Sequence, residues 1–255
     1  MKVLFIEGKY KKIISLPKDL IDALPKTIAL FNAVQFENSQ EHVKKQLEDT
    51  EKTVVLPITP HSKYKGQLLG CGIKKFKEEF DAFLYIGDGV FHPQALIIEN
   101  KKPVFCYDPF GEGFWNMLDT KIVEDKLKRK KGALSKFYAS QNIGVLVSTK
   151  PGQNYLNYAL KLKDKYPGKN FYYILNNNID FSQLENFPFV ECWVNTACPR
   201  IGIDDVYQFE KPVVNLDDVG EGLITSSIGF KEDPKMLKSI GIKLGEDKNS
   251  EEKKN

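Results

Sequence analysis

Short apolar runs alternate with amphipathic segments of helical length along most of this chain, and this alternation limits the possible folds more than any other feature. Apolar residues fill both faces of the runs at residues 82–86 and 143–148. Strands that are buried on both faces are typical of parallel sheets with helices on each side. The sequence therefore predicts an α/β protein.

The alternating segments divide into two series of about equal weight. Expected strands cover residues 26–32, 53–58, 82–86, 104–107, 143–148, 171–175 and 191–197, and expected helices cover residues 39–49, 120–140 and 154–165. We expect two similar small parallel-sheet domains with flanking helices, at residues 1–118 and 119–244. Residues 245–255 lack apolar side chains, which predicts a disordered charged tail.

Composition and charge exclude several classes of protein. The chain has 255 residues, 42% of them hydrophobic, and a net charge of +3, so it can bury a core but lacks the global field of a dedicated nucleic-acid binder. No apolar run approaches the roughly 20 residues needed to span a bilayer, and the first residues lack a signal-peptide layout. We expect a cytoplasmic protein without membrane or direct nucleic-acid contacts. Its four cysteines are then free thiols, metal ligands or catalytic groups.

Two turns carry cysteines in conspicuous settings. Cys71 lies between glycines in GQLLGCG, where the backbone is sterically open to a bulky ligand; a small buried thiol in a tight turn is the alternative. Cys198 precedes Pro199 in TACPRIGIDD. Because proline ends the strand there, Cys198 is expected at the carboxyl edge of a sheet, with Arg200 nearby to favour the thiolate; otherwise this is a surface turn. No local spacing rule joins the two cysteines.

Two further turns follow expected strands. In GDGVFHP, Gly87 and Gly89 let backbone amides approach a ligand, and Asp88 and His92 offer polar contacts. The segment lacks the Gly-Lys-Ser/Thr ending of a P-loop and the third glycine of the dinucleotide fingerprint, and an ordinary strand–turn–helix fits it equally. Asp108 ends the expected strand at CYDP. It can bind a hydroxyl or an amine, or cap its own turn.

Taken together and in order, these turns resemble the diphthamide-synthesis family. The segments GQLLGC, YIGDGVFHPQAL, DPF, VSTKPGQ and ACPRIGIDD occur in that family's order, and ALFNAVQF resembles the opening of its middle domain. The likeness covers residues 26–212. Members of this family make 2-(3-amino-3-carboxypropyl)histidine on translation elongation factor two, the first step of diphthamide biosynthesis.

The resemblance implies a transferase with an iron–sulfur cofactor. Family members have three similar α/β domains, and one cysteine from each binds a single 4Fe-4S cluster whose open iron holds S-adenosylmethionine. Reductive cleavage releases an aminocarboxypropyl radical that adds to the histidine imidazole, and 5′-methylthioadenosine is left behind.

Residue by residue, the resemblance assigns roles to eight positions and no catalytic residue beyond the cluster. Cys71 matches the middle-domain ligand and Cys198 the last-domain ligand. The expected S-adenosylmethionine pocket is lined by Gly87, Asp88, Gly89, His92, Asp108 and Gln153, although Gln153 can equally cap a turn.

The third ligand is missing from the matched region. In the family it comes from an N-terminal domain, whereas only residues 1–25 precede the match here and they contain no cysteine; we expect a shortened member that lacks most of that domain. Cys192 and Cys198, six residues apart on one expected strand, would be separated by roughly 20 Å, which excludes Cys192. Cys106 is a candidate replacement, although the resemblance implies a small buried residue there.

Otherwise a second chain supplies the third thiolate, or the cluster is incomplete. The expected partners are therefore elongation factor two, an electron donor, and a second subunit in a homodimer or heterodimer. The alternative function is a non-catalytic subunit or scaffold of such a synthase; an unrelated α/β small-molecule binder is a third reading.

The remaining candidates are interpreted as structural. The basic run KLKRKK at residues 126–131 predicts a solvated helix face, with a contact to the elongation factor as the alternative. His42 and His61 are isolated and interpreted as surface or structural residues, and Trp115 and Trp193 as packing residues.

Overall fold

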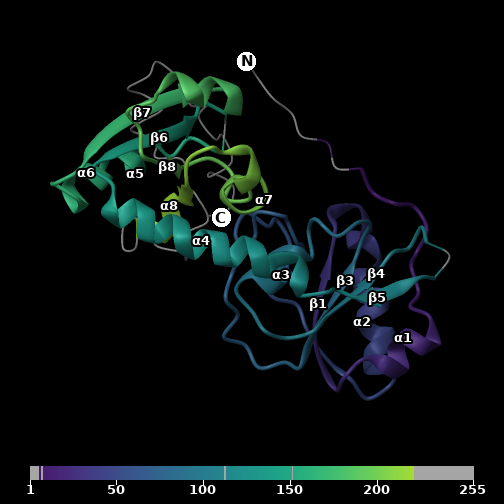
Figure 1. Ribbon diagram of the computed structural model, residues 1–255. Coiled ribbons are helices and arrows are strands. Elements are labelled where there is room, and N and C mark those ends of the chain that lie inside the picture. The colour runs from purple at the N-terminus through teal and green to yellow at the C-terminus, as the bar shows by residue number, and fades with distance from the viewer. Residues whose placement is uncertain (1–5, 7, 112, 151, 221–255) are drawn as a thin grey trace, which may run out of the picture.

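A computed structural model describes residues 6, 8–111, 113–150 and 152–220, which form two lobes, each built on one open β-sheet (Figure 1). The expected charged tail at residues 245–255 lies outside these residues. Within the described ranges, no helix is both long and apolar enough to cross a membrane.

The first sheet has the strand order β2-β1-β3-β4-β5. Its parallel strands are β1 (Thr27–Asn32), β2 (Thr53–Val55), β3 (Ala82–Ile86) and β4 (Val104–Tyr107), and β5 (Trp115–Met117) pairs with β4 in the antiparallel direction. The associated helices are α1 (Lys18–Ala23), the 3-10 helix Val34–Ser39, α2 (Gln40–Glu48) and α3 (Gln94–Ile98).

The second sheet is parallel throughout, in the order β7-β6-β8-β9. Its strands are β6 (Asn142–Ser148), β7 (Asn170–Asn176), β8 (Cys192–Asn195) and β9 (Val213–Asn215). Its helices are α4 (Lys121–Ala139), α5 (Leu156–Leu160), α6 (Leu162–Lys165), α7 (Ile201–Asp204) and α8 (Leu216–Val219), with 3-10 helices at Phe181–Asn186 and Val206–Gln208. The order β2-β1-β3-β4 in the first sheet corresponds to β7-β6-β8-β9 in the second, so the four parallel strands of each lobe follow the same topology. This confirms the predicted fold class of two similar α/β units.

Apolar side chains cover both faces of the second sheet. Val145 and Val194 pack with residues of α4, α5 and α6, whereas Leu146 and Trp193 pack on the other face with Leu184. In the first sheet, all five residues of β3 are buried, as expected for a central parallel strand. Burial on both faces is thus what the apolar runs encode.

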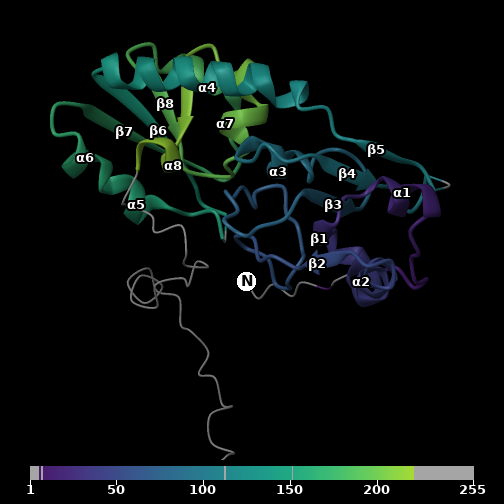
Figure 2. The same ribbon diagram turned by 90° about the horizontal axis from the view of Figure 1, so that it is seen from below.

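Helix α4 connects the two lobes. It packs on β8 and β9 and also contacts α3 of the first lobe (Figures 1 and 2). The first sheet ends at Met117 and α4 begins at Lys121, so the division that we propose at residues 118/119 falls between them.

The basic run in α4 is only partly solvated, which corrects the interpretation of a free face. Lys130 forms an ion pair with Asp218 of α8 at 2.7 Å, and Arg129 lies 4.2 Å from the ring centroid of Tyr207. Lys128, whose side chain is 76% exposed, keeps the predicted character. Some cations of this helix, Arg129 and Lys130 among them, therefore fasten it to the second lobe.

Several element boundaries differ from the prediction for local reasons. Strand β2 ends before Pro57, which cannot donate a ladder hydrogen bond. The expected helix at residues 154–165 is split, because Lys161 N–H bonds Tyr158 O in a tighter turn. Strands β5 and β9 were not predicted because three residues are too few to show a period.

Candidate functional site

Cys71 lies in a tight turn that is fastened to the carboxyl end of β1. Asn32 N–H donates to Gly66 O at 2.8 Å, and Leu68 N–H donates to Asn32 O at 3.0 Å. Gly66 has a φ of +74°, and a Cβ there would lie 2.3 Å from Gln40 Nε2, so both backbone conformation and space require glycine. This anchoring holds the half-buried Cys71 at the edge of the first sheet.

Cys198 lies in a second turn, held by two buried asparagines. Strand β8 ends at Asn195, whose Nδ2 donates to Cys198 O at 2.9 Å and to Asn215 Oδ1 at 2.8 Å. Asn215 Nδ2 in turn donates to Pro199 O at 2.8 Å. Cys198 therefore lies beyond the strand and not on it, which corrects the premise that it shares a strand with Cys192. The prediction from sequence missed both asparagines.

The two turns bring their thiols within electrostatic range of each other. Burial is the main cause that raises the pKa of Cys71, and the charge of Cys198 raises it further, against the opposing effect of Arg200. Tyr155, in the loop after β6, has its pKa raised to about 12 by burial and by the charges of Cys71, Asp217 and Cys198. Three loops at carboxyl strand ends thus meet at one seam, where open α/β sheets bind ligands.

The other two cysteines are core residues. Cys106 pairs with Tyr85 and Asn116 within the first sheet, Cys192 begins β8, and burial raises the pKa of each to about 12. In the part of the chain that is described, no group of three or more His, Cys, Asp or Glu side chains could hold a metal ion. The hypothesis that Cys106 replaces the missing ligand is therefore wrong for these residues. Cys71 and Cys198 are both partly accessible, and their role as cluster ligands stays a prediction.

The GDG turn directly follows β3, with Gly87 buried and with Asp88 and Gly89 exposed. Gly87 N–H donates to Tyr107 O at 3.0 Å, while Gly89 has a φ of +64° and open space where a Cβ would be. Asp88 Oδ1 accepts a hydrogen bond from Gln35 Nε2 at 3.2 Å. Burial lowers the pKa of His92, Asp88 raises it and Arg200 lowers it. The turn thus presents an exposed carboxylate beside an imidazole that favours its neutral form.

Asp108 and Gln153 occupy turns after strands of different sheets, β4 and β6. Asp108 Oδ1 accepts from Phe110 N–H at 2.9 Å, so the carboxylate caps its own turn. Gln153 N–H donates to Lys150 O at 3.1 Å in the loop that carries Tyr155. The Asp108 side chain therefore caps its turn and the Gln153 backbone lies in a turn, while a pocket role for either residue stays a prediction.

His61 is not isolated, which corrects its interpretation. It has a φ of +63°, and Asp217 of α8 raises its pKa although burial, the larger cause, lowers it. Asp217 itself has its pKa raised, mainly by burial and also by Asp218. This pair faces across the seam near Tyr155, and nothing in its local sequence signals the pairing.

Tyr85 contributes a buried hydroxyl that the prediction from sequence also missed. Its side chain is fully buried in β3. Among the residues that the structure describes, its Oη is a buried polar side-chain atom that has no hydrogen-bond partner. This atom lies 2.3 Å from where a Cβ of Gly87 would be. Gly87 is therefore required because the tyrosine lies against its backbone.

We expect Tyr85→Phe to raise the free energy of unfolding by about 1 kcal/mol, because it removes a buried polar group without a protein partner. Urea denaturation followed by circular dichroism measures the change. Tyr107→Phe is the matched control, since the Tyr107 hydroxyl donates to Ser15 O at 3.4 Å and its loss should be neutral or destabilising. A larger loss of stability in Tyr85→Phe than in Tyr107→Phe would contradict this account.

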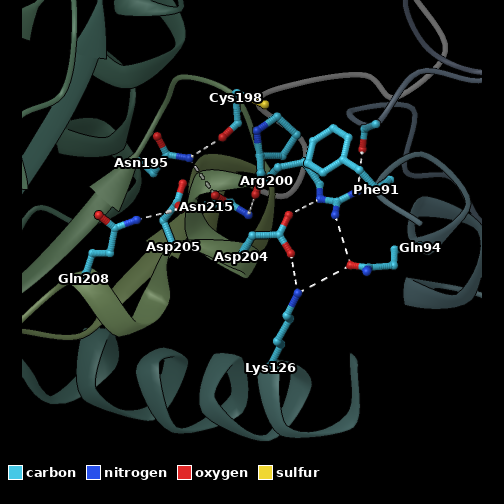
Figure 3. Close-up of polar contacts among 12 residues, drawn as sticks. Phe91, Gln94, Lys126, Asn195, Cys198, Arg200, Asp204, Asp205, Gln208 and Asn215 are labelled. Carbon is cyan, nitrogen blue, oxygen red and sulfur yellow. Dashed lines mark hydrogen bonds and ion pairs between the residues drawn. The ribbon is translucent and has the colours of Figure 1, made fainter. Parts of the chain in front are cut away.

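Asp204 forms a charged cluster with Arg200 and Lys126 at the seam (Figure 3). Burial is the largest influence on the Asp204 pKa and raises it, but hydrogen bonds and charges from the two cations together lower it below its usual value. Because the folded pKa is depressed, the stabilisation is present above the unfolded pKa of about 3.9 and is lost as pH falls through the folded value.

This predicts a pH-dependent effect of Asp204→Asn. Relative to the wild type, the variant should lose unfolding free energy by a constant amount above about pH 5 and by progressively less below about pH 4. Urea midpoints measured across this range test it. Asp125→Asn is the control, because Asp125 pairs with Lys128 while 77% exposed and should show little difference. An Asp204→Asn deficit that persists unchanged near pH 2 would refute the assignment.

Comparisons with known proteins agree with this geometry. The model of the diphthamide synthesis protein family matches residues 1–220. The 2-(3-amino-3-carboxypropyl)histidine synthase of Pyrococcus horikoshii is 35% identical over 161 residues, which are 61% of this chain and 45% of that protein. Subunit 1 of the synthase of Saccharomyces cerevisiae is 30% identical over 195 residues, 73% of this chain and 45% of that protein.

A solved structure matches the fold. The crystal structure of Dph2 from Pyrococcus horikoshii with a 4Fe-4S cluster aligns with a TM-score of 0.66 at 27% identity, covering 80% of this chain and 59% of that one. The present chain thus spans about half the length of the curated relatives that it matches. With its family model matched over both lobes, the chain belongs to the diphthamide synthesis protein family.

Proposed function

We propose that this chain takes part in transferring the 3-amino-3-carboxypropyl group from S-adenosylmethionine to a histidine of translation elongation factor two. The observation that carries the proposal is that Arg200, two residues after Cys198, donates to Gly70 O beside Cys71 at 3.2 Å, so two thiols distant in sequence belong to turns that meet at one seam. The P. horikoshii relative is named a synthase for the product of this reaction. The reaction is the first step of diphthamide biosynthesis.

Cys71 and Cys198 would supply two thiolates to a 4Fe-4S cluster, and a second chain would supply the third. When bound, the cluster supplies the electron that cleaves the sulfonium. The two cysteines suit this role because both are partly accessible, unlike the buried Cys106 and Cys192, and thiolates are the ligands that such clusters use. The Dph2 relative was crystallised with this cofactor.

The GDG turn would bind the cationic co-substrate. Gly89 allows close approach of backbone, buried Gly87 shapes the turn against Tyr85, and exposed Asp88 offers a carboxylate to the ammonium or sulfonium charge. The lowered pKa of His92 favours a neutral imidazole, which does not repel that charge. Gln153 and Asp108 would border the pocket from adjacent turns.

The proposal requires partners besides the elongation factor. They are an electron donor and a second subunit, in a homodimer or a heterodimer, that completes the thiolate set, all in the cytoplasm. The described residues bring together two accessible thiols and not three. This also favours a second candidate function, a non-catalytic subunit that supports an active synthase.

Anaerobic reconstitution with iron and sulfide separates these functions. The protein is prepared alone and with a cysteine-complete homologue, and iron content and visible absorption are measured. Formation of 5′-methylthioadenosine after addition of dithionite and S-adenosylmethionine then reports cleavage. We expect bound iron and product. A colourless, iron-free chain that still associates with the homologue would refute the catalytic role and support the scaffold.

A further inference from the structure

Arg200 crosses the seam from a position two residues after Cys198. It precedes α7, and its exposure is only 3%. On its own side, Nε donates to the Asp204 carboxylate. On the other side, the guanidinium points at the loops of the first lobe (Figure 3), so one side chain contacts both lobes.

The contacts on the far side involve the turns of the candidate site. Arg200 Nη1 donates to Gly70 O at 3.2 Å and to Phe91 O at 2.7 Å, and Nη2 donates to Gln94 Oε1 at 3.2 Å. Gly70 directly precedes Cys71, and Phe91 follows the GDG turn. The guanidinium therefore links the backbone next to one thiol with the chain next to the other.

The packing of the Phe91 ring also joins Arg200 to Gly70. The guanidinium carbon of Arg200 lies 4.1 Å from the centroid of the Phe91 ring, within the range of a cation–π contact. The same ring also lies against Gly70, where a Cβ would be 2.2 Å from Phe91 Cε1. Any side chain at position 70 would push the ring, and with it the arginine, out of place.

A guanidinium is suited to this position for physical reasons. It stays charged at any pH that the fold survives, and its planar fork holds five N–H donors in a fixed geometry, whereas an ammonium group has three donors around one point. Opening the seam would break three hydrogen bonds and a cation–π contact between the lobes, each of which stabilises the closed arrangement. The arrangement thus resists separation of the two cysteine turns without any metal present.

We propose that Arg200 is a positioning residue that sets the spacing of Cys71 and Cys198 before a cluster is assembled. This inference deepens the proposed function and rests on it, because positioning the thiols serves cluster assembly. The relation between the two thiols, however, is a property of the chain that can be measured without iron.

Dibromobimane tests this spacing in the full-length, metal-free protein, because it becomes fluorescent when both of its arms react with neighbouring thiols. Mass spectrometry of the digested product identifies the Cys71–Cys198 bridge, and single alkylation by iodoacetamide reports the reactivity of each thiol. We expect rapid bridging in the wild type. In Arg200→Ala the rate should fall by about tenfold or more, because the effective concentration of one thiol at the other drops.

Two variants keep the test independent of folding. Arg129→Ala is the matched control, since it deletes an arginine ring contact on the same lobe away from both cysteines, and it should bridge at the wild-type rate. Arg200→Lys keeps the charge without the fork and should also bridge slowly, with circular dichroism unchanged. If Arg200→Ala is poorly folded, Arg200→Lys decides the question.

Wild-type bridging in folded Arg200→Lys, a wild type that does not bridge, or an equal loss in Arg129→Ala would each overturn the proposal. Arginine-dependent bridging in a chain that binds no iron would leave the positioning role standing and refute the proposed function. The two inferences can therefore fail separately.

Discussion

Cys71→Ala and Cys198→Ala should each abolish most iron binding by the reconstituted protein. Loss of even an outer partner of a metal ligand costs roughly 10–100-fold in affinity, and loss of a ligand itself should cost at least as much. We expect cluster absorbance and 5′-methylthioadenosine formation to fall together. Iron content per chain, measured after removal of unbound iron, is the direct readout.

Cys106→Ala and Cys192→Ala are the matched controls. Both thiols are buried in strands, and burial raises their pKa values to about 12, so both should remain neutral and unavailable to iron. Their removal should leave iron content close to that of the wild type, with a modest loss of stability. Equal iron loss in all four variants would mean that Cys71 and Cys198 have no special part in the site.

Gly144→Ala should destabilise the second lobe by about 3 kcal/mol, near the upper end of overpacking costs. A Cβ at this position of β6 would lie 2.2 Å from Trp193 Cζ3 and 2.3 Å from Trp193 Cε3. The indole is 1% exposed and has little room to move. Urea unfolding monitored by circular dichroism would measure the loss.

Gly132→Ala, the same substitution at another position, should instead increase the stability of the protein. Gly132 is inside α4, and nothing lies within 4 Å of where its Cβ would be. Alanine should stabilise the helix by about 1 kcal/mol through its better helical propensity. If Gly144→Ala proved as harmless as Gly132→Ala, the close packing of Trp193 on β6 would be disproved.

The predicted strands were accurate where burial was double-sided. The predictions for β3 and β4 match the observed residues 82–86 and 104–107, because an apolar run bounded by turn residues is visible locally. Edge elements were less predictable. Strand β7 was expected at residues 171–175 and covers Asn170–Asn176, but β5, which was missed, is held by pairing with β4, and local sequence does not encode that pairing.

The residues of the candidate site also differed in how well the sequence predicted them. The proline after Cys198 placed that residue at a carboxyl strand end, and the glycines around Cys71 indicated an open turn, because proline and glycine act on the local backbone. Tyr155, Asn195 and Asn215 were missed, because their roles depend on partners in other loops. The basic run of α4 was misinterpreted for the same reason, as the partner of Lys130 lies in α8.

The sequence by itself determined the α/β class, the positions of the central strands and the two turns that hold the accessible thiols. These features follow from hydrophobic period and from backbone restrictions, which act between near neighbours. Only the tertiary structure decided that the two turns meet, because Arg200 and Gly70 are joined across 130 positions of chain. A contact of that separation depends on the packing of two complete sheets, and no local pattern specifies it.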